Sequence, residues 1–276
     1  MKFDGYKLIS LRDVQLMQLE VMKEIHRICV KRNIKYYMIA GSVLGAVRHG
    51  GFIPWDDDID IAMMREDYEQ FKQIFSEEFD ENKYYLQHYD SDVDFKPALM
   101  RFCVKNTIRD FECEMHWKYC KNMFLDIFPL DNAPDDEQLR LKQANEILKY
   151  KGIINKKLYR LFPSNSTIAV LAKKTISFAY LLYPLKKVQA KLNAVMQQYD
   201  KEDTKCVCSM ASQYKYQKQC IERTIYGTPT LLKFEDSEFF APEKPLEYLE
   251  HLYGKNYMQL PPVEKRDKPE DVYIKE

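Results

Sequence analysis

The chain has 276 residues, of which 46% are apolar and 30% are charged, and this composition is that of an ordinary globular protein without sign of disorder. Its 42 basic and 42 acidic side chains cancel, so no global field favours nucleic acid or anionic lipid as a partner. We expect no nucleic-acid partner, and any contact with a membrane has to come from a local patch.

The cysteines and the N-terminus indicate the compartment. The seven cysteines lie scattered without C-x-x-C pairs, which argues against structural zinc and against a disulfide framework. The first residues, MKFDG, show no apolar segment behind a basic start, so no secretory signal is visible. We expect reduced thiols and a cytoplasmic protein.

The first elements form a predicted phosphate-binding turn. Apolar residues at helical spacing predict a long amphipathic helix from Leu11 to Asn33. A short apolar strand from Tyr36 to Ala40 follows, and Val43 to Arg48 is a helical turn that opens just after Gly41 and Ser42. A strand, a Gly-Ser turn and a helix N-terminus are typical of an anion site, so we expect Gly41 and Ser42 to bind phosphate.

A cluster of carboxylates comes next, at Asp56, Asp57, Asp58 and Asp60. Like charges this close destabilise a fold unless a cation offsets them, and Mg²⁺ or Mn²⁺ is the natural cation for oxygen ligands. Aspartate and isoleucine alternate at the strand period from Asp58 to Met63, which predicts a strand that projects Asp58 and Asp60 from one face as a metal site. Asp56 and Asp57 follow a Pro-Trp turn and are expected to support these ligands.

Known calcium-binding and nucleotide-binding motifs fit this segment less well than the strand-borne metal site does. An EF-hand loop that starts at Asp56 requires glycine at its sixth position and glutamate at its twelfth, where this chain has Ile61 and Asp67. The Rossmann and P-loop glycine patterns are not present. A solvated acidic turn stays open as an alternative, but it explains neither the isoleucine alternation nor the Gly-Ser upstream.

The middle of the chain alternates further helices and strands. A helix is predicted from Arg65 to Phe79, and a turn with a helix N-cap from Asp131 to Asp135. Strands are predicted at Tyr84–Tyr89, Ala98–Val104, Thr107–Glu112 and Phe124–Phe128. Arg101 lies on one of these strands, and Arg48 follows the glycine turn, so we predict both as bidentate phosphate clamps, with a surface ion pair as the alternative.

Residues 136–203 are predicted to be mostly helical. The apolar stretch from Ile168 to Leu185 is too interrupted for a transmembrane helix, so we favour a buried helix over a membrane-surface helix. The membrane alternative rests on four flanking lysines, Lys173, Lys174, Lys186 and Lys187. Short strands or loops are predicted at Cys206–Ser212, Thr224, Tyr226 and Thr230–Phe234, and a helix at Pro245–Tyr253.

Three blocks of this sequence resemble a known family. Residues 41–63, GSVLGAVRHGGFIPWDDDIDIAM, resemble the signature of LicD-type phosphotransferases, and fukutin-type ribitol-phosphate transferases are more distantly similar. Residues 124–131, FLDIFPLD, look like the second block of that family. Residues from Tyr253 to Arg266 look like its C-terminal block.

The resemblance implies a fold and a site. The implied fold is α+β: a nucleotidyltransferase-like mixed sheet flanked by helices, as a single domain over residues 1–276. Residues 136–203 form its helical insertion, and residues 204–276 return to the core. On this chain the metal ligands, which are also the catalytic residues, would be Asp58, Asp60 and Asp126, with Mg²⁺ or Mn²⁺ as the cofactor. For Asp126 the role of base toward the acceptor hydroxyl stays open as an alternative to that of ligand, which we favour.

The resemblance also implies an activity. The enzyme would move phosphocholine, or a related alcohol or polyol phosphate, from a CDP-activated donor to a glycan or lipid-linked oligosaccharide and release CMP. Such bacterial enzymes modify lipopolysaccharide or teichoic acid, and we expect this one at the cytoplasmic face of the membrane. The ring of Trp55 is a candidate contact for a quaternary ammonium head group, with core packing as the alternative.

Two more functions stay open. A nucleotidyltransferase would transfer the nucleotide itself and release pyrophosphate instead of CMP. A non-catalytic relative would bind a nucleotide or a glycan, but a binding module has no need of three mutually repelling carboxylates.

Overall fold

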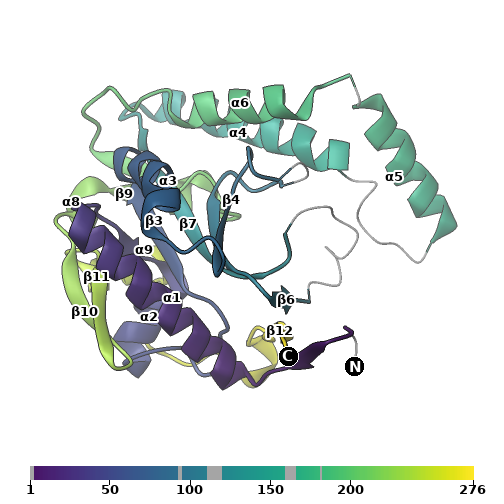
Figure 1. The fold of residues 1–276 in the computed structure, drawn as a ribbon. Coiled ribbons are helices and arrows are strands. Elements are labelled where there is room, and N and C mark those ends of the chain that lie inside the picture. The colour runs from purple at the N-terminus through teal and green to yellow at the C-terminus, as the bar shows by residue number, and fades with distance from the viewer. Residues whose placement is uncertain (1–2, 93–94, 111–119, 159–165, 181) are drawn as a thin grey trace.

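The computed structural model describes residues 3–92, 95–110, 120–158, 166–180 and 182–276, and Figure 1 shows the arrangement of its elements. The described helices are α1 (Leu11–Arg32), α2 (Ala40–His49), α3 (Arg65–Glu78), α4 (Glu137–Leu158), α5 (Thr167–Ala179), α6 (Leu185–Met196), α7 (Tyr216–Gln219), α8 (Arg223–Tyr226) and α9 (Pro245–Tyr253). The described strands are β1 (Tyr6–Leu8), β2 (Tyr37–Met38), β3 (Asp60–Met64), β4 (Tyr84–Gln87), β5 (Met100–Val104), β6 (Thr107–Arg109), β7 (Met123–Ala133), β8 (Cys206–Cys208), β9 (Cys220–Glu222), β10 (Thr230–Phe234), β11 (Ser237–Ala241) and β12 (Val272–Lys275).

A seven-stranded mixed sheet lies at the centre of the fold. β3 pairs with β7 in parallel, whereas β2 with β3, β5 with β7 and β4 with β5 pair antiparallel. The short strands β8 and β9 continue the sheet beside the end of β7. Helices packed around a mixed sheet confirm the predicted α+β class.

The main hydrophobic core covers one face of this sheet. Successive strand residues point to opposite faces, and Ile127 of β7 is buried in one cluster with Ile25 of α1 and Phe71 of α3. Asp60 and Asp126 occupy the alternate positions of β3 and β7. They therefore project from the face opposite α1 and α3.

The long helix predicted from Leu11 is α1, and local chemistry explains its two ends. The Ser10 hydroxyl accepts a hydrogen bond from the N–H of Asp13, and the Asp13 carboxylate accepts one from the N–H of Ser10. This reciprocal capping satisfies two N–H groups that the first turn leaves free. Asn33 ends the helix in the left-handed conformation, with a φ of 54°.

The helices of the 136–203 region form a second core. Ile147 and Ile154 of α4 pack with Leu192 of α6 and with Leu99, which precedes β5. α4 and α6 lie side by side along one edge of the molecule, and α5 projects beyond them (Figure 1).

The expectation of a buried helix after Ile168 is wrong. α5 ends at Ala179, and along it Ile168 is 81% exposed and Phe178 is 75% exposed. α5 packs against α4 through Ser177, whose hydroxyl donates to the carbonyl of Lys156 at 3.1 Å, so its apolar side chains face outward. In the parts of the chain that are described, no helix is long and apolar enough to cross a membrane.

Two strand boundaries differ from the predictions. β3 begins at Asp60 and not at Asp58, because tertiary contacts of Asp57 described below hold the preceding residues in a loop. β7 continues to Ala133 through the predicted turn, because residues 131–133 pair with β8. Pro129 is the register partner of Met63 on β3. On the other side of β7 it lies between the last residue that pairs with β5 and the first that pairs with β8, so its missing N–H costs no ladder hydrogen bond on that side.

Several elements, among them β1, β11 and β12, were not predicted from local pattern. β1 and β6 both pair with β12, so the two ends of the chain and the strand after β5 meet in one small sheet. β11 pairs with β10 as a hairpin, and residues 223–226 form the helix α8 instead of a strand or loop. The predicted strand Thr107–Glu112 is confirmed over β6, and residues 111–112 lie outside the described residues.

Candidate active site

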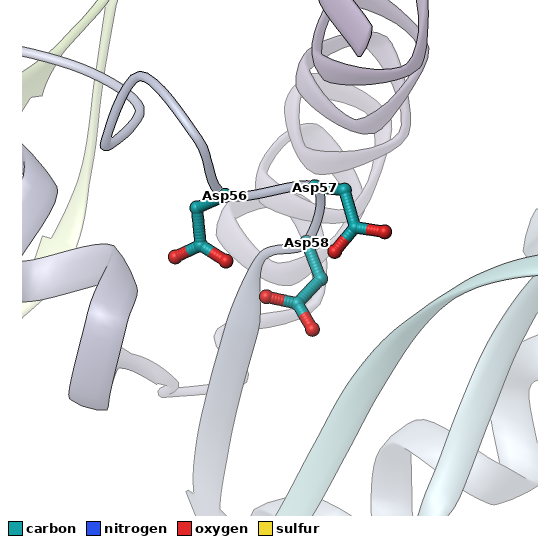
Figure 2. Close-up of side chains that lie close together, drawn as sticks. All are labelled: Asp56, Asp57 and Asp58. Atoms are coloured by element: carbon teal, nitrogen blue, oxygen red, sulfur yellow. The ribbon is translucent and has the colours of Figure 1, made fainter. Parts of the chain in front are cut away.

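The acidic residues converge where a loop enters β3. One carboxylate oxygen from each of Asp56, Asp57 and Asp58 lies within 4.8 Å of the others. Figure 2 shows the three carboxylates on the same side of this loop, with that of Asp58 between those of Asp56 and Asp57. Asp60 is the first residue of β3, and its register partner on the parallel strand β7 is Asp126.

Mutual repulsion and burial perturb these carboxylates. Burial, and after it the charges of Asp58 and Asp57, raise the pKa of Asp56 to about 8. Burial also raises the pKa of Asp58 to about 6, although the nearby Arg109 guanidinium opposes this rise. The pKa of Asp60 lies well above its usual range because of burial and the charge of Asp58. The site therefore lacks full charge compensation from the protein itself.

Asp57 is held by protein groups. Its two carboxylate oxygens accept hydrogen bonds from one nitrogen of Arg109 at 3.1 and 3.0 Å, and the N–H of Glu270 donates to one of them at 2.9 Å. The same nitrogen of Arg109 lies 3.9 Å from an Asp58 oxygen. Arg109 thus braces the acidic loop from β6, and sequence reasoning assigned it no role because nothing local links it to a residue so far back in the chain.

Arg101 lies beside the predicted third ligand. It is the register partner of Asp126 across β5 and β7, and its Nε donates to Asp126 Oδ1 at 3.0 Å. The guanidinium carbon lies 3.7 Å from the ring centroid of Phe124, which fixes the plane of the group. A guanidinium is therefore placed at the acidic cluster, and its role as a phosphate clamp stays a prediction.

Arg48 has different neighbours. It lies near the C-terminal end of α2 and donates to the carbonyl oxygens of Tyr257 and Gln259 at 3.0 and 3.4 Å. Its Nε donates to His49 at 2.9 Å. Arg48 thus ties the C-terminal segment to α2, and none of the described carboxylates pairs with it.

Trp55 carries a cation that belongs to the protein. The guanidinium carbon of Arg266 lies 4.1 Å from the Trp55 ring centroid, and the His49 ring meets it edge-on at 6.3 Å. Sequence reasoning placed Arg266 in the C-terminal block without a role. The predicted contact between Trp55 and a substrate head group stays a prediction, and one face of the ring is occupied.

The Gly-Ser turn meets the acidic cluster from the side of α2. A Cβ at Gly41 would lie 3.0 Å from an Asp56 oxygen, so glycine permits this close approach. The Ser42 hydroxyl accepts a hydrogen bond from the N–H of Asp60 at 2.8 Å and so holds the start of β3. Counting only described residues, the N–H of Gly41 has no hydrogen-bond partner, which leaves one donor at the first turn of α2.

The donor set fits a divalent cation. Carboxylate oxygens are hard ligands of the kind that Mg²⁺ and Mn²⁺ prefer, and their raised pKa values reflect a need for positive charge. The predicted ligands Asp58, Asp60 and Asp126 lie on the loop and on adjacent strands. Asp56 was predicted as a supporting residue, but its carboxylate shares the side of Asp58 and is a further candidate ligand.

Comparisons with known proteins agree with this arrangement. Residues 33–167 match the nucleotidyltransferase domain described as LicD/FKTN/FKRP. The chain is 27% identical over 265 residues to the lipopolysaccharide cholinephosphotransferase LicD of Haemophilus influenzae, across 94% of this chain and 95% of that protein. It is 44% identical over 41 residues to the ribitol 5-phosphate transferase FKRP of Homo sapiens, across 15% of this chain and 8% of that protein.

The fold and the acidic cluster thus define a nucleotidyltransferase-like enzyme of phosphate chemistry. Residues 33–167 carry a domain of the LicD type, and this domain contains all the predicted site residues. This result confirms the predicted class, a transferase of phosphate-containing groups.

Proposed function

We propose that this chain transfers phosphocholine, or a related alcohol or polyol phosphate, from a CDP-activated donor to a hydroxyl of a glycan precursor. The observation that carries the proposal is the convergence of Asp56, Asp58, Asp60 and Asp126, carboxylates whose charge the protein compensates only in part. The relative in Haemophilus influenzae is named for choline phosphate and lipopolysaccharide, and the human relative for ribitol 5-phosphate. Both names support an alcohol phosphate as the transferred group.

The cofactor in this proposal is Mg²⁺, or Mn²⁺ in its place. Asp58, Asp60 and Asp126 are its ligands, and Asp56 is an added ligand from the loop. Such a cation, when bound, neutralises the phosphates of the donor as charge develops on the leaving group. Asp57, through its hydrogen bonds with Arg109, holds the loop that carries Asp58.

The remaining groups place the donor for an in-line displacement. The free N–H of Gly41 and the guanidinium of Arg101 bind donor phosphate oxygens. The acceptor hydroxyl oxygen forms a bond to the phosphorus that carries the alcohol, and the bond from this phosphorus to the oxygen shared with CMP breaks. CMP leaves with that oxygen, and the hydroxyl proton passes to an ionised carboxylate of the site.

The acceptor in this proposal is a lipid-linked oligosaccharide at the cytoplasmic face of the membrane. α5 supports such a location, because its apolar side chains are exposed and Lys173 and Lys174 lie among them. An exposed apolar face with lysines is suited to reversible contact with anionic lipid.

One assay tests the activity. The protein is incubated with Mg²⁺, a lipid-linked glycan fraction and, separately, CDP-choline, CDP-ribitol, CDP-glycerol or CDP-ethanolamine, with the Asp60→Asn variant as the control. We expect CMP release with one donor class and none from the variant. Release of pyrophosphate would instead assign nucleotide transfer, and donor binding without release of either product would assign a non-catalytic relative.

A further inference from the structure

Two tyrosine rings hold the ammonium group of a lysine in the C-terminal region. Lys218 belongs to the short helix α7, and its Nζ lies 4.3 Å from the ring centroid of Tyr214 and 5.7 Å from that of Tyr253. Tyr253 is the last residue of α9, and Tyr214 lies in the segment that precedes α7. An alkylammonium group thus already occupies a site made of two aromatic faces.

The lysine is not fixed there by an ion pair. Throughout the described ranges, no carboxylate lies within ion-pair distance of Lys218. A hydrogen bond joins its backbone carbonyl to His251 Nε2 of α9 at 3.1 Å, so the backbone is anchored while the four-carbon side chain stays free to move. The ammonium group can therefore leave the rings without breaking a salt bridge.

The two rings lie at the border of the acidic cluster. α9 is tied to the start of α2, because the Tyr248 hydroxyl accepts a hydrogen bond from the N–H of Ala40 at 3.0 Å. Arg48 of α2 also donates to the carbonyl of Tyr257, just after α9, at 3.0 Å. Tyr253 thus ends a helix that packs beside α2, and the first turn of α2 meets the acidic cluster at Gly41 and Asp56.

The rings are open to an incoming ligand. Tyr214 is 53% exposed and Tyr253 is 36% exposed. A quaternary ammonium has no N–H to donate, so aromatic faces are its main means of recognition, whereas a polyol head group gains little from them. Trp55 is a poorer candidate, because the planar guanidinium of Arg266 already lies against its ring.

We propose that Tyr214 and Tyr253 form the subsite for a cationic alkylammonium head group of the donor, and that the Lys218 ammonium fills this subsite until the donor displaces it. This inference rests on the proposed function and specifies its substrate class. It assigns Lys218 as an internal competitor of the head group.

Steady-state kinetics with a cationic and a neutral donor test the assignment. Tyr214→Leu and Tyr253→Leu are expected to raise the KM for CDP-choline on the order of tenfold, as loss of a cation–π contact predicts, and to leave the KM for CDP-glycerol nearly unchanged. Lys218→Met is expected to lower the KM for CDP-choline, because the competing cation is gone. Tyr253→Phe keeps the aromatic face and is expected to restore most of the affinity for CDP-choline that Tyr253→Leu loses.

Lys149→Met is the matched control, because Lys149 lies 5.6 Å from the ring centroid of Tyr150 on α4, in another part of the fold. It should change neither KM. Equal changes of both KM values in the tyrosine variants, or a higher KM for CDP-choline in Lys218→Met, would overturn the assignment. Should Tyr253→Leu fail to fold, the exposed Tyr214→Leu still decides.

Calorimetry separates this inference from the proposed function. CDP-choline and CDP-glycerol are titrated into the full chain and into Tyr214→Leu without an acceptor. A loss of affinity confined to CDP-choline supports the subsite even if no CMP is released in the assay above, an outcome that would reject the transfer. CMP release from CDP-ribitol alone, with no binding of CDP-choline, rejects the subsite and leaves the transfer standing.

Discussion

At the scale of single residues, three adjacent aspartates differ in what surrounds them. The Asp57 carboxylate is buried and hydrogen-bonded to Arg109 and to the Glu270 N–H. Asp56 and Asp58 face each other, and their pKa values are raised. Asp57 therefore has a structural role, whereas Asp56 and Asp58, with the same side chain in the same loop, form part of the acidic cluster.

Substitutions in this loop and at Asp60, the first residue of β3, should separate the two roles. Asp58→Asn and Asp60→Asn are expected to abolish transfer and to leave the thermal unfolding midpoint unchanged or higher, because each removes one repelling charge. Asp57→Asn is expected to lower that midpoint, because it weakens the contact with Arg109 inside the protein. Full activity in Asp58→Asn or Asp60→Asn would disprove the ligand assignment.

The protonation of these carboxylates makes metal binding depend on pH. Without metal, Asp56 and Asp58 hold their protons more tightly in the folded than in the unfolded chain, so the stability they contribute is lost as pH rises from about 4 through about 6 and 8. Because protons and Mg²⁺ compete for the same oxygens, we expect Mg²⁺ to raise the unfolding midpoint more at pH 8.5 than at pH 5.5. Differential scanning fluorimetry measures the unfolding midpoint with and without Mg²⁺ at each pH. An equal rise of the midpoint at the two pH values would contradict a metal site on these residues.

Arg101 provides a test of guanidinium geometry. Arg101→Ala is expected to raise the KM for the donor or to lower kcat, and Arg101→Lys should rescue poorly, since an ammonium replaces a planar fork. The kinetics are measured with the donor that the CMP assay identifies. Full rescue by lysine would mean that Arg101 contributes only its charge, and unchanged kinetics in both variants would assign it to the pair with Asp126 alone.

At the scale of elements, one buried ion pair joins α3 to the end of β7. Arg65 donates to the two oxygens of Asp131 at 2.6 and 2.8 Å, and Asp131 is 0% exposed. Burial raises the pKa of Asp131 to about 6 in spite of this partner. The ion pair therefore adds little to the stability of the fold over what an apolar contact would give. If one partner is removed, however, the other is left as an uncompensated buried charge.

We expect Asp131→Asn to lower the free energy of unfolding by about 3–5 kcal/mol, because Arg65 then stays buried without its counter-charge. Glu69→Gln is the control. Glu69 pairs with the same arginine at 3.1 Å, but its side chain is 41% exposed, so its loss should cost under about 1 kcal/mol. Urea denaturation gives both values, and similar effects of the two substitutions would mean that α3 and β7 are held together by other contacts.

At the scale of the whole molecule, α5 is the element that projects farthest from the central sheet (Figure 1). We expect the unmodified protein to sediment with anionic vesicles at low salt and to be released by high salt, with about 1 kcal/mol lost per lysine removed. The variant that tests this carries glutamine at Lys173, Lys174, Lys186 and Lys187.

A matched variant carries glutamine at four exposed lysines elsewhere, Lys7, Lys201, Lys233 and Lys255. It has the same net charge as the test variant and should still bind. If both variants bind equally, or if salt has no effect, α5 does not mediate membrane contact.

Local sequence patterns determined much of this protein. The helical spacing and the caps of α1, the extent of α9 and the acidic motif depend on residues close in the chain, so they could be predicted from the sequence. The three predicted ligands and Arg101 were proposed in the same way, through their strand positions and the family blocks, and the structure brings Asp60, Asp126 and Arg101 into register on neighbouring strands.

Contacts between distant residues were decided only by the tertiary structure. The partners of Asp57, the guanidinium on Trp55 and the lysine between two tyrosines join segments that no local pattern connects. The exposure of α5 was missed for the same reason, since an apolar run is buried only where another layer covers it. Electrostatic and packing energies depend on distances in space, and these are set when β12 joins β6 and α9 packs beside α2.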